Sequence, residues 1–479
     1  MKKNTLSYLI AALSGALIMQ TAYGFNPRWG TTDSTGSTGN TDTSTPVQTP
    51  DTGSDSGSGT GSTRPPAVEE YEPVTNQYVY KGISPSNAQH TDSAHFRIYH
   101  NGSGVANISQ GNLDVTLAHL EAAYNQFVVD GGFRSPGLSV HSDRGPAYKL
   151  NVYPQAYMNA GGVMLYDYRA GLSYLEVLSS QLTIPRVTVH EYGHSLALAS
   201  KTWVDQGRTG AWWETVANWV ADTYLNSPYY EDVQKRYGLA APSTIIDLNK
   251  VIGQSNMMIV SDQNYYEAWP FLTYLTSNPD KFPGLGKNAV RDMLKSHSGN
   301  NETPLHVLER VASSTKVQRI LGRYWAHMAY MDIGHPRAQQ LFFNSRSRLN
   351  FANLDSIGNQ TYRVKSNRQP QYGGANINPL TVNGNGTVSV DVTNLGNGLR
   401  ESNFTATLAI RARNGSVRYV DLPNGSGQAV VNSDEEVSLV VANTPDTLYQ
   451  YDAFRSTSSS PEMKGLNYQV KLTGATPAR

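Results

Sequence analysis

The chain has 479 residues, with 38 Lys and Arg against 38 Asp and Glu, and it contains no cysteine. The length predicts two or three domains, each large enough to bury a core of its own. The absence of cysteine excludes a disulfide scaffold, a thiol enzyme and a Cys-ligated zinc ribbon, and the balanced charge gives little long-range attraction for nucleic acid or anionic lipid.

The N-terminus is typical of an export signal. Two lysines precede an apolar run over residues 6–19, and Ala22 and Gly24 are the small residues that a signal peptidase recognises. We therefore predict a signal peptide over residues 1–24, a secreted, extracellular protein, and no membrane contact in the mature form. An uncleaved anchor helix is the alternative, although the run is short for a membrane span.

A low-complexity segment follows the signal. Residues 31–66 are almost wholly Thr, Ser, Gly, Asp, Asn and Pro. Such a composition buries too little apolar surface to offset the entropy lost on ordering, so we expect a disordered linker over residues 25–67. A propeptide that shields an active site until cleavage is the alternative.

The next part of the chain has a mixed α/β pattern. Residues 94–99 and 148–153 alternate as strands do, residues 113–129 carry apolar side chains at helical spacing, and Leu172–Leu178 again has strand character. Pro185 then begins a helical run.

Helices dominate the middle of the sequence, and short strands dominate its end. The predicted helices cover residues 212–225, 229–237, 264–275, 288–297, 304–312 and 316–331, and the predicted strands cover residues 387–392, 405–411, 416–421 and 436–441. We therefore predict an α+β protein in which a domain over residues 68–370 precedes an antiparallel β-sandwich over residues 371–479.

The chemistry is carried by His190-Glu191-Tyr192-Gly193-His194. Two histidines four residues apart lie on one helix face and can bind one ion, while Glu191 lies beside the open coordination position and suits a general base for water. Random placement of the same residue types would give about 0.008 such patterns in a chain of this length. The pattern predicts a zinc site.

A third ligand is predicted 20 residues after His194, because Glu214 lies in the first turn of the next helical run. Two His and one Glu leave a fourth position open for water. Asn218 and Asp222, one and two turns further on, are candidates to accept a hydrogen bond from a ligand imidazole. The alternatives are a helix N-terminal acid for Glu214 and solvated polar side chains for the other two.

These residues resemble those of the gluzincin metallopeptidases, in which His-Glu-x-x-His is followed by a Glu ligand on a later helix. A longer match over about residues 70–479, which includes Trp212-Trp213-Glu214 and the Tyr-Tyr-Glu-Ala-Trp-Pro of residues 265–270, resembles the Svx/AvrXca-type secreted virulence proteins of plant-pathogenic bacteria. The resemblance implies a gluzincin-like catalytic unit, in which a twisted sheet with an active-site helix precedes a mainly helical subdomain. Asn218 departs from the Asp that is common in gluzincins, which removes a charge behind the first histidine.

The function that this resemblance implies is that of a zinc-dependent endopeptidase with one catalytic Zn²⁺ that cleaves extracellular protein, including host or plant cell-wall protein. Glu191 would act as the general base, and Tyr265 or Tyr266 would donate to the oxyanion, with simple aromatic packing as the alternative for both. We expect a monomer, a protein or glycoprotein substrate bound as an extended strand at the edge of Leu172–Leu178, and no nucleic-acid partner.

Other readings of the site and of the C-terminal domain stay open. The chain could be an effector or binding protein with a structural zinc site and no turnover, or a zinc hydrolase that acts on a non-peptide bond. In the C-terminal domain, Tyr449 and Tyr451 could stack on sugars, or the domain could be a passive cover for the catalytic unit.

Overall fold

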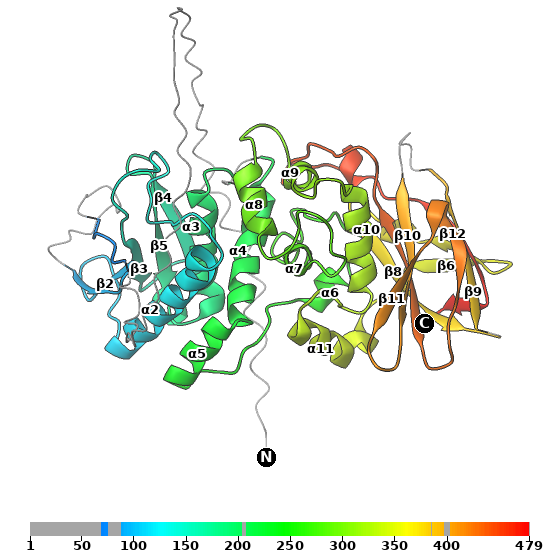
Figure 1. Ribbon diagram of the computed structural model, residues 1–479, viewed down its shortest axis with the longest axis horizontal. Helices are drawn as coiled ribbons and strands as arrows, with labels where there is room; N and C mark the ends of the chain where they lie inside the picture. Colours follow the sequence, from blue (N-terminus) through cyan, green and yellow to red (C-terminus); the bar gives the residue numbers. More distant parts are fainter. Residues whose placement is uncertain (1–68, 75–87, 204–206, 385, 397–402, 479) are drawn as a thin grey trace, which may run out of the picture. The chain divides into compact units, whose positions relative to one another are not determined.

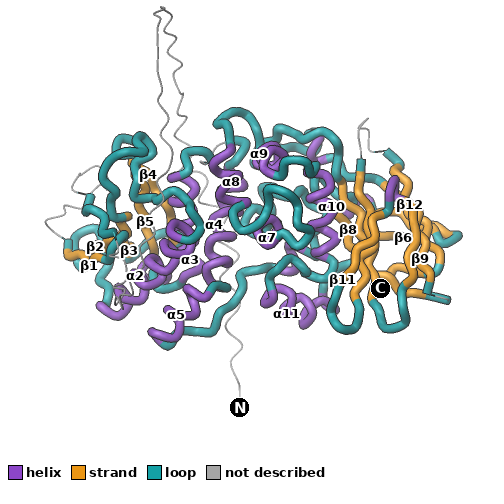
Figure 2. The backbone as a smooth tube through the Cα atoms, viewed as in Figure 1, coloured by secondary structure: helices purple, strands orange, loops and turns teal. Residues whose placement is uncertain are grey.

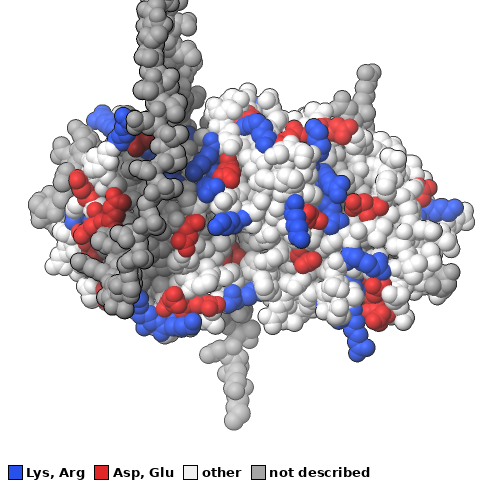
Figure 3. All heavy atoms as spheres, viewed as in Figure 1, with Lys and Arg blue, Asp and Glu red and all other residues white. Residues whose placement is uncertain are grey.

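The computed structural model describes residues 69–74, 88–203, 207–384, 386–396 and 403–478. The predicted signal peptide and linker lie outside these residues. Among the residues described, no helix is both long and apolar enough to cross a bilayer. On the face drawn in Figure 3, basic and acidic side chains are interspersed, in keeping with their equal totals in the sequence.

The first part of the described chain is built on a five-stranded mixed sheet. Its strands follow the order β1-β2-β3-β5-β4, in which β2, β3 and β5 are parallel and the two edge strands are antiparallel. One face of the sheet carries buried apolar side chains that belong to the same core as those of the neighbouring helices. Figure 1 shows helices beside this sheet. The strands are β1 (Gln89–Asp92), β2 (Phe96–His100), β3 (Leu150–Gln155), β4 (Gly162–Asp167) and β5 (Leu172–Leu178).

The position of β5 corrects one expectation. Leu172–Leu178 forms the predicted strand, but it pairs with β3 on one side and with β4 on the other. The expectation that this strand receives a substrate at its edge is therefore wrong, because both of its edges are already paired. The edge strand on this side of the sheet is β4, which sequence reasoning missed because Gly-Val-Met-Leu-Tyr lacks a clear alternation of apolar and polar residues.

Helices form the middle of the chain, between the two groups of strands in Figure 2. Pro185 begins α3, as predicted, because a proline in the first turn has no N–H group to leave unpaired. The predicted helix over residues 264–275 is shorter than expected, since residues 264–269 form turns that precede Pro270. The helices are α2 (Gln110–Tyr124), α3 (Pro185–Ala199), α4 (Gly210–Leu225), α5 (Pro228–Tyr237), α6 (Leu248–Val251), α7 (Pro270–Ser277), α8 (Ala289–Ser296), α9 (Pro304–Val311), α10 (Val317–Met328) and α11 (Pro336–Ser345).

Two antiparallel five-stranded sheets form the end of the chain, with orders β11-β10-β13-β8-β15 and β12-β9-β14-β7-β6. Leu408 and Leu439 from the first sheet and Val390 and Val470 from the second belong to one buried cluster. The mixed α+β class is thus confirmed. The strands are β6 (Leu354–Gly358), β7 (Thr361–Val364), β8 (Ala375–Val382), β9 (Thr387–Asn394), β10 (Phe404–Arg411), β11 (Val417–Asp421), β12 (Ser426–Val430), β13 (Glu436–Asn443), β14 (Tyr468–Thr473) and β15 (Ala475–Pro477).

Helices α3 and α4 approach each other closely at Gly193. A Cβ atom at this position would lie 2.9 Å from the Cα atom of Ala217 and 3.1 Å from the Cβ atom of Val220. Glycine within a helix costs about 1 kcal/mol relative to alanine, so this residue reflects the contact rather than helix propensity. The close approach sets how far side chains of α4 reach toward α3.

A charged network joins the helices to the C-terminal sheets. His327 in α10 lies 2.9 Å from Asp280 through Nε2 and 2.6 Å from the Asp332 carbonyl through Nδ1, so both ring nitrogens face acceptors. Tyr419 of β11 hydrogen-bonds to Asp332, and Arg323 pairs with Asp280. Burial lowers the pKa of His327, but the neighbouring carboxylates outweigh burial and raise it.

We predict that Gly193→Ala lowers the free energy of unfolding by about 1–3 kcal/mol, because the added methyl group overpacks the α3–α4 contact. Urea denaturation measures the effect. Gly111→Ala in α2 is the matched control, since a Cβ atom there meets nothing within 4 Å, and it should leave stability unchanged or raise it by about 0.5–1 kcal/mol. Equal effects of the two substitutions would contradict the packing argument.

We also predict that His327→Gln destabilises the protein more at pH 6 than at pH 9. A histidine whose pKa is raised on folding contributes stability that is fully present below the unfolded pKa of about 6.5 and is lost as the pH rises through the folded pKa. The measurement is the free energy of unfolding of wild type and variant at both pH values. His90→Gln, at an exposed position, is the control and should have a small effect at both pH values. A pH-independent effect of His327→Gln would show that the His327 ring is not charged.

Candidate metal centre

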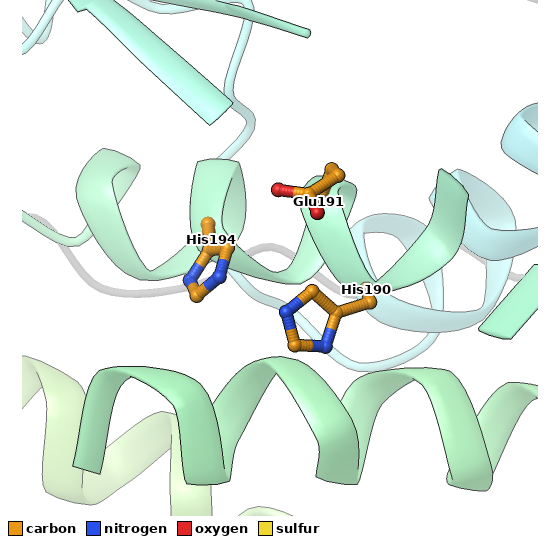
Figure 4. A group of neighbouring side chains, drawn as sticks. All are labelled: His190, Glu191 and His194. Atoms are coloured by element: carbon orange, nitrogen blue, oxygen red, sulfur yellow. The ribbon is translucent and has the colours of Figure 1, made fainter. Parts of the chain in front are cut away.

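Helix α3 carries the first three residues of the site. His190 and His194 are one turn apart, and both imidazole rings project toward α4 (Figure 4), with ring centroids 4.7 Å apart. One ligand atom from each of His190, Glu191 and His194 lies within 4.8 Å of the others, and all three residues are buried. These atoms are close enough together to hold one metal ion.

Helix α4 brings Glu214 to the same point. Its Oε2 atom lies 3.1 Å from Nε2 of His190 and 3.3 Å from Nε2 of His194. This oxygen is buried and lacks a hydrogen bond of good geometry, so it is a polar atom without a proper partner. A divalent cation bound by two imidazole nitrogens and a carboxylate oxygen would satisfy it, and this donor set suits zinc.

The electrostatics of these residues also favour a cation. Burial raises the pKa of Glu214, but His194 and His190 outweigh burial and hold it well below its usual value. Burial lowers the pKa of His190, whereas the carboxylates of Glu214 and Glu191 raise it to about 9. The carboxylate therefore attracts positive charge to the histidine nitrogens, which either a proton or a metal ion can supply.

Asn218 orients the first histidine, while Asp222 lies at a different place. The Oδ1 atom of Asn218 is 2.7 Å from Nδ1 of His190, which turns Nε2 of the ring toward Glu214. Asp222, one turn further along α4, accepts hydrogen bonds from His335 and from the backbone at residue 245. Its contacts are therefore with the packing around α4 rather than with a ligand histidine.

Tyr266 faces the site, and the Tyr265 ring lies beside the Tyr266 ring, with 4.6 Å between centroids. The Tyr266 ring centroid is 6.2 Å from that of His190, its carbonyl accepts a hydrogen bond from Asn218, and its side chain bonds to Glu214. Burial, followed by the charge of Glu214, raises the pKa of Tyr266 strongly, so the phenol stays protonated and able to donate. The Tyr265 ring also packs edge-on against Phe454, 5.4 Å between centroids.

Two features beside the site were not predicted as functional. The Trp213 indole stacks on His194, with centroids 4.9 Å apart and an interplanar angle of 19°. A Cβ atom at Gly162 in β4 would lie only 2.7 Å from Cγ of Glu191, so this glycine lets the edge strand lie against the carboxylate. A glycine within a strand run is a signal for close approach, and it could have indicated this contact.

The C-terminal part of the chain holds the segment that carries Tyr266. Residues 255–259 exchange backbone hydrogen bonds with residues 371–375, at 2.8 Å between Gln371 N and Asn256 O and 3.1 Å between Ile259 N and Tyr372 O. Tyr451 donates a hydrogen bond of 3.0 Å to the Val260 carbonyl.

Because of this contact, the side chain of Tyr451 is buried. The residue is only 4% exposed, so of the two alternatives for this domain the stacking of Tyr451 on sugars is excluded. The neighbouring Tyr449 ring packs against Tyr372, 4.9 Å between centroids. Both tyrosines therefore contribute to the junction between the C-terminal sheets and the helices.

The fold and the side-chain cluster together define an α+β protein with a buried His, His and Glu cluster that can hold a metal ion. The chain belongs to the DUF6055 family, a family of unknown function, whose model matches residues 68–479. A search of curated proteins found no match.

We predict that Asn218→Ala weakens zinc binding by about 10- to 100-fold, because His190 loses the acceptor that fixes its ring. Competition with a chromophoric chelator measures the affinity. Asn218→Asp keeps an acceptor at the same place and should bind zinc as well as wild type or better. Unchanged affinity in Asn218→Ala would mean that this hydrogen bond does not orient a ligand.

Proposed function

We propose that this protein is a secreted zinc metallopeptidase of the gluzincin type that cleaves extracellular protein. In this proposal His190, His194 and Glu214 hold one zinc ion, and the sheet, α3 and the following helices form the catalytic unit. The two C-terminal sheets form a β-sandwich joined to it. Export rests on the N-terminal sequence pattern.

The observation that carries the proposal is the position of Glu191. This carboxylate is buried beside the two histidines, yet Glu214 already supplies the third ligand oxygen. A carboxylate oxygen of Glu191 lies within 4.8 Å of a ligand nitrogen of each histidine, so it can reach a water molecule at the same ion and take its proton. A zinc site that only stabilises the fold would not require it.

The chain's own residues then have the following roles. Zinc, when bound, lowers the pKa of water and polarises a carbonyl group. Glu191 accepts the proton of the attacking water and later delivers it to the leaving amine. Tyr266 donates a hydrogen bond to the oxygen of the attacked carbonyl as negative charge develops there. Trp213 packs on His194 and limits rotation of that ring.

The edge strand β4 supports a peptide as the substrate. It borders Glu191 at Gly162, and the sheet order leaves its second edge without a neighbouring strand among the residues described. An extended peptide can pair with such an edge through its main chain, whatever its sequence. A non-peptide substrate would not use this edge, which is why we favour the peptidase over a zinc hydrolase of another bond.

We predict that purified protein with zinc cleaves unfolded protein and that a chelator abolishes the cleavage. Glu191→Ala should reduce kcat by at least about 10³-fold and still bind about one zinc ion per chain, because the residue transfers protons rather than binding metal. Cleavage assays and metal analysis of the same samples give both quantities. A Glu191→Ala variant that cleaves as fast as wild type would rule out this base.

Glu214→Ala separates ligation from proton transfer, since it should lose zinc as well as activity. Glu309→Ala, a substitution on the surface of α9, is the control and should keep both. If wild type binds zinc but cleaves no polypeptide, the protein is a zinc-binding effector without turnover or a hydrolase of another bond.

A further inference from the structure

In the part of the chain that the structure describes, the exposed aromatic side chains lie on one strand and its flanking loops. Among the residues described, three aromatic side chains are exposed: Tyr157 at 85%, Tyr166 at 38% and Tyr168 at 55%. All three lie on β4 or in the loops at its two ends. The other exposed large apolar side chains are aliphatic and lie on separate elements, namely Val129, Leu341, Ile357, Leu395 and Val430.

The register of β4 places Tyr166 on the same face as the catalytic carboxylate. Gly162, Met164 and Tyr166 alternate along one face, opposite Val177, Leu175 and Ser173 of β5, respectively. Val177 and Leu175 are buried in the core that includes α3, so this face is the one that α3 covers.

Distances along the strand follow from this register. Gly162 contacts Glu191, and Tyr166 is four residues further along β4. At about 3.3 Å per residue, Tyr166 lies roughly 13 Å along β4 from Gly162, the residue beside which the substrate would be cleaved. Met164, between them, packs partly against the core and adds apolar surface.

Tyr157 lies at the other end of β4. It follows β3, which ends at Gln155, and the partner of Gln155 in β5, Leu178, donates a hydrogen bond to the carbonyl of Gly161. Tyr157 and Tyr166 therefore lie on opposite sides of the point where Glu191 meets the strand.

We propose that Tyr166, with Tyr168 beyond it, forms a subsite for aromatic side chains of an extended polypeptide, and that Tyr157 contributes a second contact on the other side of the scissile bond. This inference rests on the peptidase function proposed above. A substrate strand antiparallel to β4 places a residue about four positions N-terminal to the scissile bond opposite Tyr166. Aromatic pairs across neighbouring strands are favourable, and the exposed Tyr166 ring can form one at little cost in side-chain entropy. The Tyr168 ring already carries the Arg169 guanidinium over one face, 5.6 Å from its centroid, so it borders the subsite.

The main chain of β4 favours a polypeptide over a glycan as the ligand of this subsite. A paired edge offers main-chain N–H and C=O groups at regular spacing, which an extended peptide matches along its length. The ring of Tyr166 stands on that edge, so a side chain reaches it only when the peptide backbone is in register with β4. A sugar on a flexible stem has no such register.

The experiment is a cleavage profile of wild type on a peptide library. We expect Phe, Tyr and Trp to be enriched about 5-fold over Ala at one position about four residues N-terminal to the cleaved bond. Tyr166→Phe keeps the ring and should keep the preference. Tyr166→Ser should abolish it, so that aromatic residues are no longer enriched over Ala. On the preferred peptide, Tyr166→Ser should raise KM about 5-fold and leave kcat unchanged, and Ile357→Ser is the exposed control.

Binding tests the subsite independently of turnover. A fluorescent peptide with Phe at the preferred position should bind zinc-loaded Glu191→Ala about 5-fold more tightly than its Ala counterpart, and Tyr166→Ser in the same background should remove the difference. Cleavage by wild type without an aromatic preference, or a preference that survives Tyr166→Ser, overturns the inference and leaves the peptidase intact. Peptide binding that follows attached sugars rather than Phe also overturns it. A failure of all cleavage together with ring-dependent peptide binding removes the peptidase and keeps the subsite.

Discussion

The metal centre depends on the contact between α3 and α4. The two ligand histidines lie on α3 and the glutamate on α4, so three donor atoms meet only if the helix axes are close. Gly193 lies between the histidines in sequence and allows this approach, since any side chain there would press on Ala217. The same helix pair sets the Asn218 hydrogen bond to His190. The absence of a side chain at Gly193 therefore permits the spacing of the ligand atoms, the orientation of the His190 ring and the packing of α3 on α4.

Local patterns predicted much of this arrangement. Helical spacing brings His190 and His194 together, and the four-residue spacing of Glu214 and Asn218 places both on one face of α4. The strands at residues 172–178 and 436–441 were recognised because their apolar residues are consecutive or alternate clearly. In each case the residues that predict a helix or strand lie within that helix or strand.

What sequence reasoning missed depends on contacts between distant segments. The edge position of β4 follows from pairing among five strands, and nothing within Leu172–Leu178 distinguishes an interior strand from an edge strand. Asp222 has the same spacing from Asn218 as Asn218 has from Glu214, but His335, far along the chain, binds it elsewhere. The packing of the Tyr265 ring likewise depends on Phe454, which lies in the C-terminal part.

The backbone pairing of residues 255–259 with residues 371–375 has a consequence for the order in which the site is completed. The segment that carries Tyr266 gains those hydrogen bonds, and the one from Tyr451, only after the last part of the chain has been made and has folded. Synthesis runs from the N-terminus, so α4 and its hydrogen bond to the Tyr266 carbonyl can form before these contacts exist. Residues after 370 therefore add the last supports of this segment, although none of them supplies a ligand atom.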